Sequence, residues 1–473
     1  MKIRNPRTGE ADHEIAPLDE NAVGAKAARL RTGQPEWSAK TPGQRGAILE
    51  LWADAIEANL ASIVPALTDD TGRGGISKIE AAGVPGQIRR WANAAPDLIA
   101  SAQPSGKPTS VPTITTSTRL VPYPLVGVIS PWNFPMTLAL IDAIPALMAG
   151  CAVLIKPSEV TPRFIGPLME TVSKIPELAS VLSLIEGDGA TGAAMIAHVD
   201  YVCFTGSVAT GRKVGEAAAR AFIPASLELG GKDPMIILAD ADPDTAASIA
   251  LRASIVNTGQ ACQSIERVYV AQAIAEPFLD SLVRQAEAVE LNHPDISVGH
   301  IGPFIFEKQA QIAQRQIDDA VEQGATIRAG GTVENLDGGL YLRPTVLTDV
   351  SKDMEIICEE NFGPVIPVTV YDDVEEAISL ANDSQFGLSA AVIGADIAEA
   401  EAIASRLHAG AVSINDGSLT SMVWEAEKSS FGYSGLGASR MGDSGLMRFF
   451  RKQALIRQSG EAAVIDAFAE QNF

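Results

Sequence analysis

Cys262 is the residue whose surroundings best suit nucleophilic chemistry. It lies in a polar, glycine-bearing segment, residues 257–263, between a predicted helix and a predicted strand. The other cysteines, Cys151, Cys203 and Cys358, stand among apolar residues and are predicted to be small buried side chains. Because the thiolate is the reactive form of cysteine, the polar turn favours Cys262 as an accessible thiolate. The alternative is an unreactive cysteine in an ordinary turn.

Two other side chains could assist such a nucleophile. Glu228 is a carboxylate at the end of an apolar strand-like run, and burial disfavours its charged form, which suits a general base. A helix cap or an ion pair with Lys232 would explain the same residue. Asn133 lies between Pro131 and Pro135, so its amide would be held rigidly and could donate to an oxyanion. A turn asparagine that bonds its own backbone is the alternative.

A third segment suits a phosphate group. A predicted strand ends at Thr205, and Gly206 and Ser207 open a helix that contains Gly211. Free backbone N–H groups and the helix dipole make such a helix start a site for phosphates. The spacing is not GxGxxG, so an ordinary strand-to-helix turn explains the segment equally well.

The predicted elements place these residues at strand ends. Strands are expected at residues 125–130, 152–156, 201–205 and 226–229, with helices at 136–149 and 208–221. Strands that alternate with helices predict open parallel sheets, and ligands bind such sheets beyond the carboxyl ends of the strands. A second series of strands and helices follows Gly231. We therefore expect two α/β domains with a boundary near Gly230 and Gly231.

Residues 121–155 resemble a membrane span in composition, because Asp142 is their only charged residue before Lys156. Five prolines interrupt the stretch, whereas a transmembrane helix needs about 20 apolar residues in one element. Parallel strands are covered on both faces and give apolar runs of this kind. The stretch is therefore predicted to be a buried strand–helix–strand unit.

Composition excludes several classes of partner. The 473 residues carry 36 Lys and Arg against 58 Asp and Glu, a formal net charge of −22. Nucleic acid and anionic membranes attract basic surfaces, so neither is expected as a partner. Four cysteines without a CxxC pair and five histidines without an HExxH motif predict no metal and no disulfide framework. With a polar start and no apolar leader, the chain is expected to be cytoplasmic.

Seven short motifs occur in an order that resembles a known family. They are PWNFP at 131–135, IKPSEVTP at 155–162, FTGS at 204–207, LELGGK at 227–232, GQAC at 259–262 followed by Arg267, EENFGP at 359–364 and FGLSA at 386–390. In these motifs the sequence resembles the NAD(P)-dependent aldehyde dehydrogenases, which oxidise aldehydes to carboxylic acids. The resemblance runs from Asn5 to about Arg457, nearly the whole chain.

The resemblance implies a role for each matching residue. Cys262 would be the nucleophile that forms a thiohemiacetal and then a thioester, Glu228 the base that activates water, and Asn133 the oxyanion donor. The cofactor-binding residues it implies are Ile129, Trp132, Lys156, Glu159, Gly189, Gly206, Ser207, Leu229, Glu360 and Phe362. The substrate-pocket residues it implies are Leu138, Ile141, Gln263 and Trp424. Glu159 beside the ribose favours NAD, with some use of NADP allowed.

The resemblance also implies an architecture. A Rossmann-like NAD-binding domain would comprise residues 1–102 and 123–230, and an α/β catalytic domain residues 231–449. Residues 103–122 and 450–473 would form a small β oligomerisation element and a C-terminal tail. An exposed strand of β-branched residues favours pairing with another chain, so a homodimer or homotetramer is expected. The apolar share of the pocket favours an aromatic or medium-chain aldehyde.

The chain departs from the family pattern in three places. Ala438 and Ser439 stand where an Arg-Glu pair is usual, residues 415–430 form a longer segment, and residues 460–473 extend beyond the expected end. The extension has a short amphipathic pattern at residues 462–469 and is expected to dock on its own or a neighbouring subunit. A frayed terminus is the alternative. Three other functions stay open: a CoA-acylating enzyme, an ester hydrolase that uses the same cysteine, and a non-catalytic relative.

Overall fold

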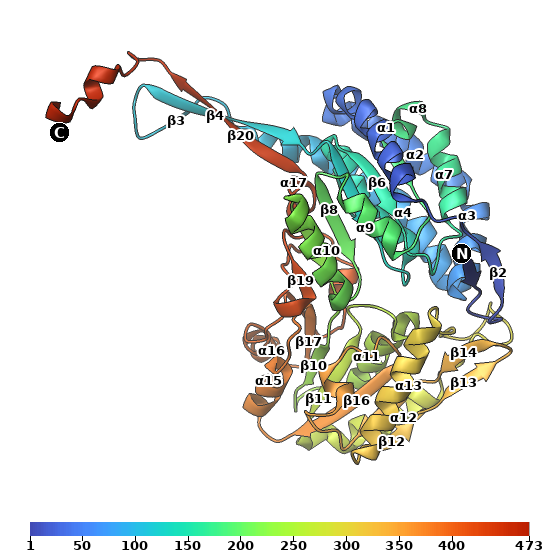
Figure 1. The fold of residues 1–473 in the computed structure, drawn as a ribbon. Helices are drawn as coiled ribbons and strands as arrows, with labels where there is room; N and C mark the ends of the chain where they lie inside the picture. The colour runs from blue at the N-terminus through green and yellow to red at the C-terminus, as the bar shows by residue number, and fades with distance from the viewer. Residues whose placement is uncertain (473) are drawn as a thin grey trace.

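The computed structural model describes residues 1–472 and consists of two lobes and a projecting arm (Figure 1). The upper lobe in Figure 1 contains the N-terminal helices and a six-stranded sheet, and the lower lobe a seven-stranded sheet. The chain passes from the first sheet to the second between Glu228 and Asp233. The mixed α/β class with parallel sheets, expected from the alternating pattern, is confirmed.

The six-stranded sheet is parallel except at one edge. Its strands are β5 (Leu125–Ile129), β6 (Ala152–Lys156), β7 (Leu182–Leu184), β8 (Tyr201–Thr205), β9 (Ala225–Glu228) and β19 (Gly435–Leu436). They lie in the order β19-β9-β8-β5-β6-β7, and only β19 is antiparallel to its neighbour. Strand β19 thus brings a segment from far along the chain beside Glu228.

Helices cover both faces of this sheet and enclose one large apolar core. They are α1 (Glu20–Ala39), α2 (Pro42–Ala58), α3 (Leu60–Thr71), α4 (Gly74–Ser101), α5 (Pro135–Leu140), α6 (Ala143–Ala149), α7 (Ile165–Ser173), α8 (Pro176–Ala179), α9 (Gly189–Ile196), α10 (Val208–Ala221) and α17 (Ser444–Met447). Strand β8 and helix α10 have their predicted bounds.

The single helix expected at residues 136–149 is wrong. The structure has two helices there, α5 and α6, separated at Ile141 and Asp142. Pro145 explains the break, because a proline ring clashes with the carbonyl four residues earlier, here that of Ile141. The break leaves Asp142 buried at the start of α6.

The seven-stranded sheet is also mostly parallel. Its strands are β10 (Asp233–Ile237), β11 (Ile265–Ala271), β12 (Thr326–Ala329), β15 (Thr345–Thr348), β16 (Val365–Tyr371), β17 (Ser389–Ile393) and β18 (Ala411–Ile414). Their order is β12-β15-β16-β11-β10-β17-β18, with β12 antiparallel. The helices of this lobe are α11 (Pro243–Ile255), α12 (Ala275–Glu287), α13 (Glu307–Glu322), α14 (Glu355–Cys358), α15 (Val374–Asn382) and α16 (Ile397–Ala404). Strand β10 was not predicted from the sequence.

Two hairpins and the arm complete the fold. The hairpins pair β1 (Lys2–Arg4) with β2 (Ala11–Glu14) and β13 (Val333–Leu336) with β14 (Gly339–Leu342). In the arm, β20 (Phe450–Gln458) pairs antiparallel with β4 (Ile114–Pro122) along its whole length, and β4 pairs with β3 (Lys107–Pro108). The arm carries the C-terminal segment away from both lobes (Figure 1).

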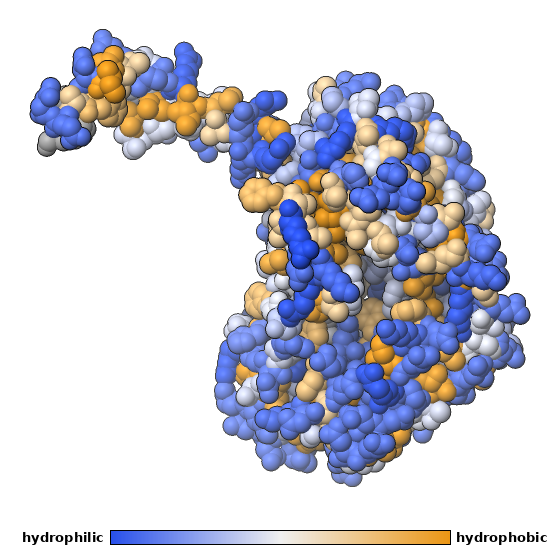
Figure 2. All heavy atoms as spheres, viewed as in Figure 1, coloured by the Kyte–Doolittle hydropathy of each residue, from blue (hydrophilic) through white to orange (hydrophobic). Residues whose placement is uncertain are grey.

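Exposed apolar side chains mark the arm and its end. They belong to Leu455, Ile456, Val464, Ile465 and Phe468. Figure 2 shows orange patches along the arm, which stands clear of the body. The C-terminal segment forms two short 3-10 turns, Ile465–Phe468 and Glu470–Asn472, and the apolar side chains of the first stay exposed on this chain.

Within residues 1–472, no helix is both long enough and apolar enough to cross a membrane. In the same residues, no group of three or more His, Cys, Asp and Glu side chains is placed to hold a metal ion.

Candidate active site

The turn that carries Cys262 has an unusual backbone. It follows a 3-10 turn, Val256–Gly259, in which Asn257, Thr258 and Gly259 all have positive φ, between 60° and 69°. A Cβ added to Gly259 would lie 2.2 Å from the carbonyl oxygen of Gly363. Glycine is therefore required there on two grounds, a left-handed backbone and a close backbone approach. The contact places the turn against the loop that contains Phe362.

The surroundings of Cys262 act on its thiol in opposite directions. Burial raises the pKa of Cys262 to about 12, and the carboxylates of Glu360 and Asp233 add to the rise. Lys428 and Arg440 oppose it with their positive charges. The residue is half-buried, and its burial opposes the accessible thiolate that the sequence predicts.

The other cysteines divide differently from the sequence prediction. Cys151 and Cys203 are fully buried, as predicted, and burial raises the pKa of both thiols. Cys358, predicted to be buried, is exposed at the end of α14. The apolar residues before it, Ile356 and Ile357, turn inward because α14 is a single helical turn, which leaves the fourth residue outside.

Asn133 lies beside the nucleophile turn and is almost completely buried. Its side-chain amide donates to the carbonyl oxygen of Gln260 at 2.9 Å, two residues before Cys262. Its own carbonyl oxygen accepts from the guanidinium of Arg73 at 2.9 Å and from the amide of Asn257 at 3.2 Å. The amide therefore bonds a neighbouring turn and not its own backbone, the alternative that the sequence left open.

Glu228 ends β9, and two cations face its carboxylate. The Nζ of Lys428 lies 3.9 Å from its Oε2, and the Nε of Arg440 lies 3.8 Å from its Oε1. The hydroxyl of Ser430 donates to Oε2 at 3.3 Å. The ion pair with Lys232 that the sequence left open does not form. Lys232 instead donates to the carboxylate of Glu266 at 2.7 Å.

Glu266 is a structural residue of the site that the sequence analysis missed. Its carboxylate is buried and accepts from the backbone N–H groups of Asn361 and Phe362 at 2.8 and 2.9 Å. Together with Lys232 it fixes the loop that carries Phe362. A charged residue inside the apolar strand β11 is the one signal that could have revealed it.

Six of the predicted cofactor residues lie beyond the carboxyl ends of the parallel strands. Ile129 and Lys156 end β5 and β6, Gly189 opens α9, Gly206 and Ser207 join β8 to α10, and Leu229 follows β9. A Cβ on Gly192 would contact the side chains of Ile129 and Lys156 at 3.6 and 3.7 Å, so α9 covers these strand ends. Helix α10 starts at the N-cap Ser207 and has no acidic residue in its first turn, which suits a phosphate.

The other predicted cofactor residues lie nearby in pairs. Lys156 Nζ and Glu159 Oε2 are 2.8 Å apart. The rings of Trp132 and Phe362 meet edge to face at 5.3 Å. The carboxylate of Glu360 accepts from the backbone N–H of Gly231 at 3.2 Å, and burial raises its pKa to about 8.

The glycine turn after β9 connects these parts. A Cβ on Gly231 would lie 2.8 Å from the carbonyl oxygen of Cys262, and one on Gly230 would lie 2.5 Å from the carboxylate of Glu360. The turn that follows Glu228 is therefore packed between the nucleophile segment and Glu360. The structure brings together the neighbourhoods of all three predicted catalytic residues.

The predicted pocket residues lie in three separate segments of the chain. Leu138 and Ile141 lie at α5, and the side chain of Gln263 is hydrogen-bonded to Thr420. The ring of Trp424 lies under the guanidinium of Arg90, 5.4 Å away. Residues 415–430, which are mostly irregular, thus reach both Gln263 and α4.

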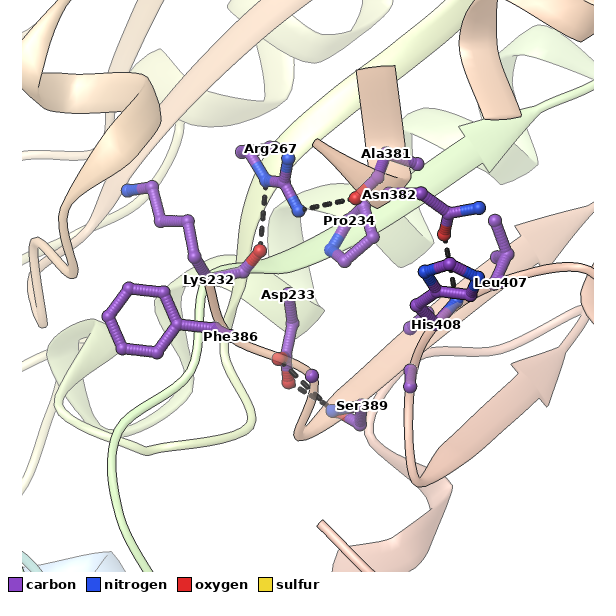
Figure 3. Close-up of a pocket in the computed structure, with 13 residues that line it drawn as sticks. Lys232, Asp233, Pro234, Arg267, Ala381, Asn382, Phe386, Ser389, Leu407 and His408 are labelled. Carbon is purple, nitrogen blue, oxygen red and sulfur yellow. Dashed lines mark hydrogen bonds between the residues drawn. The ribbon is translucent and has the colours of Figure 1, made fainter. Parts of the chain in front are cut away.

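Two cavities lie near these groups, and neither is lined by the four predicted pocket residues. One, of about 10 Å³, is enclosed by residues that include Lys232, Asp233, Arg267 and Ser389 (Figure 3). It has room for about one water molecule, too little for an aldehyde or a cofactor. The other, of about 180 Å³, is lined by Glu228, Ser430, Ala438 and Ser439 among others.

The comparisons with known proteins agree with the fold and the motifs. The sequence matches the family model described as "Aldehyde dehydrogenase family" over residues 1–455. A Mycolicibacterium smegmatis protein provisionally named as an NADP(+) succinate-semialdehyde dehydrogenase is 35% identical over 436 residues, which cover 92% of this chain and 84% of that protein.

Solved structures are similar over almost the entire chain. The structure of PutA from Anabaena variabilis, provisionally described as an aldehyde dehydrogenase, has a TM-score of 0.96 and 49% identity and covers 98% of both chains. Betaine aldehyde dehydrogenase from Staphylococcus aureus, solved in complex with NAD+, has a TM-score of 0.90 and 29% identity, covering 98% of this chain and 93% of that one.

The fold and these matches define an NAD(P)-dependent oxidoreductase. The chain belongs to the aldehyde dehydrogenase family, as its motifs indicated. It oxidises an aldehyde to a carboxylic acid with NAD(P), by way of a cysteine thiohemiacetal and a thioester that activated water hydrolyses.

Proposed function

We propose that Cys262 is the nucleophile of this oxidation, Asn133 the oxyanion donor and Glu228 the base for water. The observation that carries the proposal is the meeting of three turns. Asn133 bonds the carbonyl of Gln260, and the turn after Glu228 lies against the carbonyl of Cys262. A nucleophile, a hydrogen-bond donor and a carboxylate thus share one partly enclosed region.

The first half of the reaction needs a thiolate. The Sγ of Cys262 forms a bond to the aldehyde carbon, and the electron pair of the C=O bond moves to oxygen. A side-chain amide at Asn133 and the backbone N–H of Cys262 are suited to stabilise that oxyanion. A nicotinamide cofactor bound at the strand ends would supply the hydride acceptor, and Cys262 would then carry the acyl group as a thioester.

The second half is hydrolysis of the thioester. A water oxygen bonds the acyl carbon, the carbon–sulfur bond breaks, and the proton of the water passes to the carboxylate of Glu228. The hydrogen bond from Ser430 and the two nearby cations hold that carboxylate in place.

The residues at the strand ends fit a dinucleotide. The start of α10 at Gly206 and Ser207 would take the phosphates. Glu159 would accept hydrogen bonds from the ribose hydroxyls. Its carboxylate already pairs with Lys156 and offsets the charge of that lysine. The 2′-phosphate of NADP would therefore be repelled by Glu159 and gain little attraction from Lys156. We therefore propose NAD as the preferred cofactor.

The parts of the chain would divide the work. Residues 1–102 and 123–230 would bind NAD, and residues 231–449 would supply the catalytic domain. Residues 103–122 and 450–473 would join subunits into a homodimer or homotetramer, since the apolar side chains of the arm are exposed on this chain. Four free cysteines and the net charge of −22 are consistent with a reducing cytoplasm.

Two classes of aldehyde are candidates. Leu138, Ile141 and Trp424 favour an aromatic or medium-chain aldehyde. Arg90 brings a positive charge beside Trp424, which favours an aldehyde with a carboxylate, the class in the name of the mycobacterial relative. Rates of NADH formation with benzaldehyde, hexanal and succinate semialdehyde would separate the two.

The test of the mechanism is a trapped intermediate. With Glu228→Gln, a rapid burst of NADH should precede slow turnover, and mass spectrometry should find an acyl group on the peptide that contains Cys262. Glu216→Gln, on the exposed side of α10, is the matched control and should show neither. Wild-type turnover by Glu228→Gln, without an adduct, would reject the proposed base.

A further inference from the structure

Asp142 is the buried anchor of a charged network that reaches the active site. It is fully buried and accepts from the guanidinium groups of Arg440, at 3.1 Å, and of Arg448. Arg440 also donates to the hydroxyl of Thr205. Two contacts therefore fix the end of the Arg440 side chain. Its Nε makes no hydrogen bond within residues 1–472 and lies 3.8 Å from Glu228.

Lys428 approaches the same carboxylate from a separate segment. Its side chain is 5% exposed, and its Nζ lies 3.9 Å from Oε2 of Glu228. The ammonium group donates to the hydroxyl of Ser430 at 3.4 Å, and that hydroxyl donates to Oε2 at 3.3 Å. The three side chains form a hydrogen-bonded chain in which each donor points toward the carboxylate.

Lys428 and Arg440, the cation pair, also act on the nucleophile. Both lower the pKa of Cys262, against the burial and the carboxylates that raise it. Neither residue is explained by the proposed roles of Cys262, Glu228 and Asn133. Both come from the segment after β18, where the chain departs from its family pattern at Ala438 and Ser439.

We propose that the cation pair, Lys428 and Arg440, holds the carboxylate of Glu228 in position to act on water. The inference rests on the proposed role of Glu228. Both cations are positioning residues, because they act through Glu228 and are not assigned a contact with the aldehyde. They act through the approaches of 3.9 and 3.8 Å and through the hydroxyl of Ser430.

Other charges surround the two reacting groups and must be held constant in a test. They are Asp142 before α6, Cys203 on β8, Asp233 on β10, Glu360 after α14 and Arg448 after α17. Lys428 is the better position for substitution, because removal of Arg440 would leave the buried carboxylate of Asp142 with one partner fewer.

The first experiment separates the two halves of the reaction in single turnovers at one pH. Lys428→Met should slow thioester hydrolysis by about tenfold, because the carboxylate of Glu228 loses one of the groups that hold it, and should leave the burst of NADH unchanged. Lys428→Arg should restore most of the hydrolysis rate, and Lys174→Met, on the exposed end of α7, should match the wild type.

The second experiment measures the acyl intermediate. During steady turnover, mass spectrometry should find more acyl group on the peptide that contains Cys262 in Lys428→Met than in the wild type. A lysine with a purely structural role would lower stability and slow both halves of the reaction alike. Wild-type hydrolysis together with a wild-type level of adduct would overturn the proposal.

Two controls keep the outcome interpretable. If Lys428→Met does not fold, Ser430→Ala removes the bridging hydroxyl instead and should slow thioester hydrolysis in the same way by a smaller factor. Wild-type hydrolysis in that variant would also count against the proposal. Failure of the proposed function is a separate result, because Cys262→Ala would then retain dehydrogenase activity whatever Lys428 does.

Discussion

The ammonium group of Lys156 lies 2.8 Å from the carboxylate of Glu159, three residues later in the chain. The lysine is buried at the end of β6, whereas about a third of the glutamate side chain is exposed. Because the two opposite charges offset each other, the end of β6 carries little net charge. In the proposed cofactor site, a neutral pair accepts ribose hydroxyls more readily than a phosphate dianion.

Replacement of Glu159 should therefore change cofactor choice. Wild-type protein should have a higher kcat/KM with NAD than with NADP at fixed aldehyde. In Glu159→Ser the ratio of NADP to NAD use should rise by about tenfold, because Lys156 would lose its partner and attract the added phosphate. Glu177→Ser, in the distant α8, should leave the ratio unchanged. Equal use of both cofactors by the wild type would contradict the prediction.

Asn133 is expected to act on the rate of the chemical step. Asn133→Ala should lower kcat by about 10²–10³, the usual effect of removing one oxyanion donor, with a smaller change in KM. The exposed Asn335→Ala provides the matched control on β13. A rate within a factor of about three of the wild type would exclude Asn133 from the oxyanion site.

The cysteines should separate into catalytic and structural groups. Cys262→Ala should abolish NADH formation, whereas Cys203→Ala should retain it and lose about 1 kcal/mol of stability through a small cavity in the core. Assays of purified protein, with circular dichroism to confirm folding, give both results. Dehydrogenase activity in folded Cys262→Ala would refute the nucleophile assignment.

Asp233 should make stability depend on pH. Burial raises its pKa to about 7, from an ordinary value of 3.8, although Ser389 donates to it. The folded state therefore holds the proton more tightly than the unfolded state. This contribution to stability is complete at low pH and is lost as pH rises from about 4 to about 7. In Asp233→Asn, the fall in melting temperature between pH 5 and pH 7 should be smaller than in the wild type.

Truncation tests the C-terminal segment. Removal of the residues after Ser459 takes away the exposed Val464, Ile465 and Phe468, which this chain alone does not cover. If they dock on a neighbouring subunit, sedimentation should show a weaker oligomer and the melting temperature should fall. The same mass and melting temperature in both forms would mean that the segment is an unattached end.

Local patterns sufficed for much of the fold. Strand β8 and helix α10 have their predicted bounds, because β8 is one short apolar run and the amphipathic α10 begins at the capping residue Ser207. Strand β10 was missed because its short apolar run follows directly on a glycine turn, two charged residues and a proline. Its place in the middle of a sheet is decided by neighbours from remote parts of the chain.

Contacts between remote residues could not be predicted in the same way. Lys232 and Glu266 are 34 residues apart and meet only because β10 and β11 are neighbours. The approach of Lys428 and Arg440 to Glu228 depends on β19, a two-residue strand without a sequence signature. The motifs indicated which residues act, whereas the charges around those residues required the folded structure.

The base of the arm has a mechanical consequence. Phe449, directly before β20, is fully buried, packs on the ring of Tyr201 at 5.5 Å and accepts a hydrogen bond from the N–H of Tyr123. Arg448 beside it is tied to Asp142. The arm is thus held firmly at the point where it leaves the body. A force on its free end would bend the strands beyond Phe450, and the distortion would not extend to Arg440. A movement of the arm would therefore leave the charges around Glu228 undisturbed.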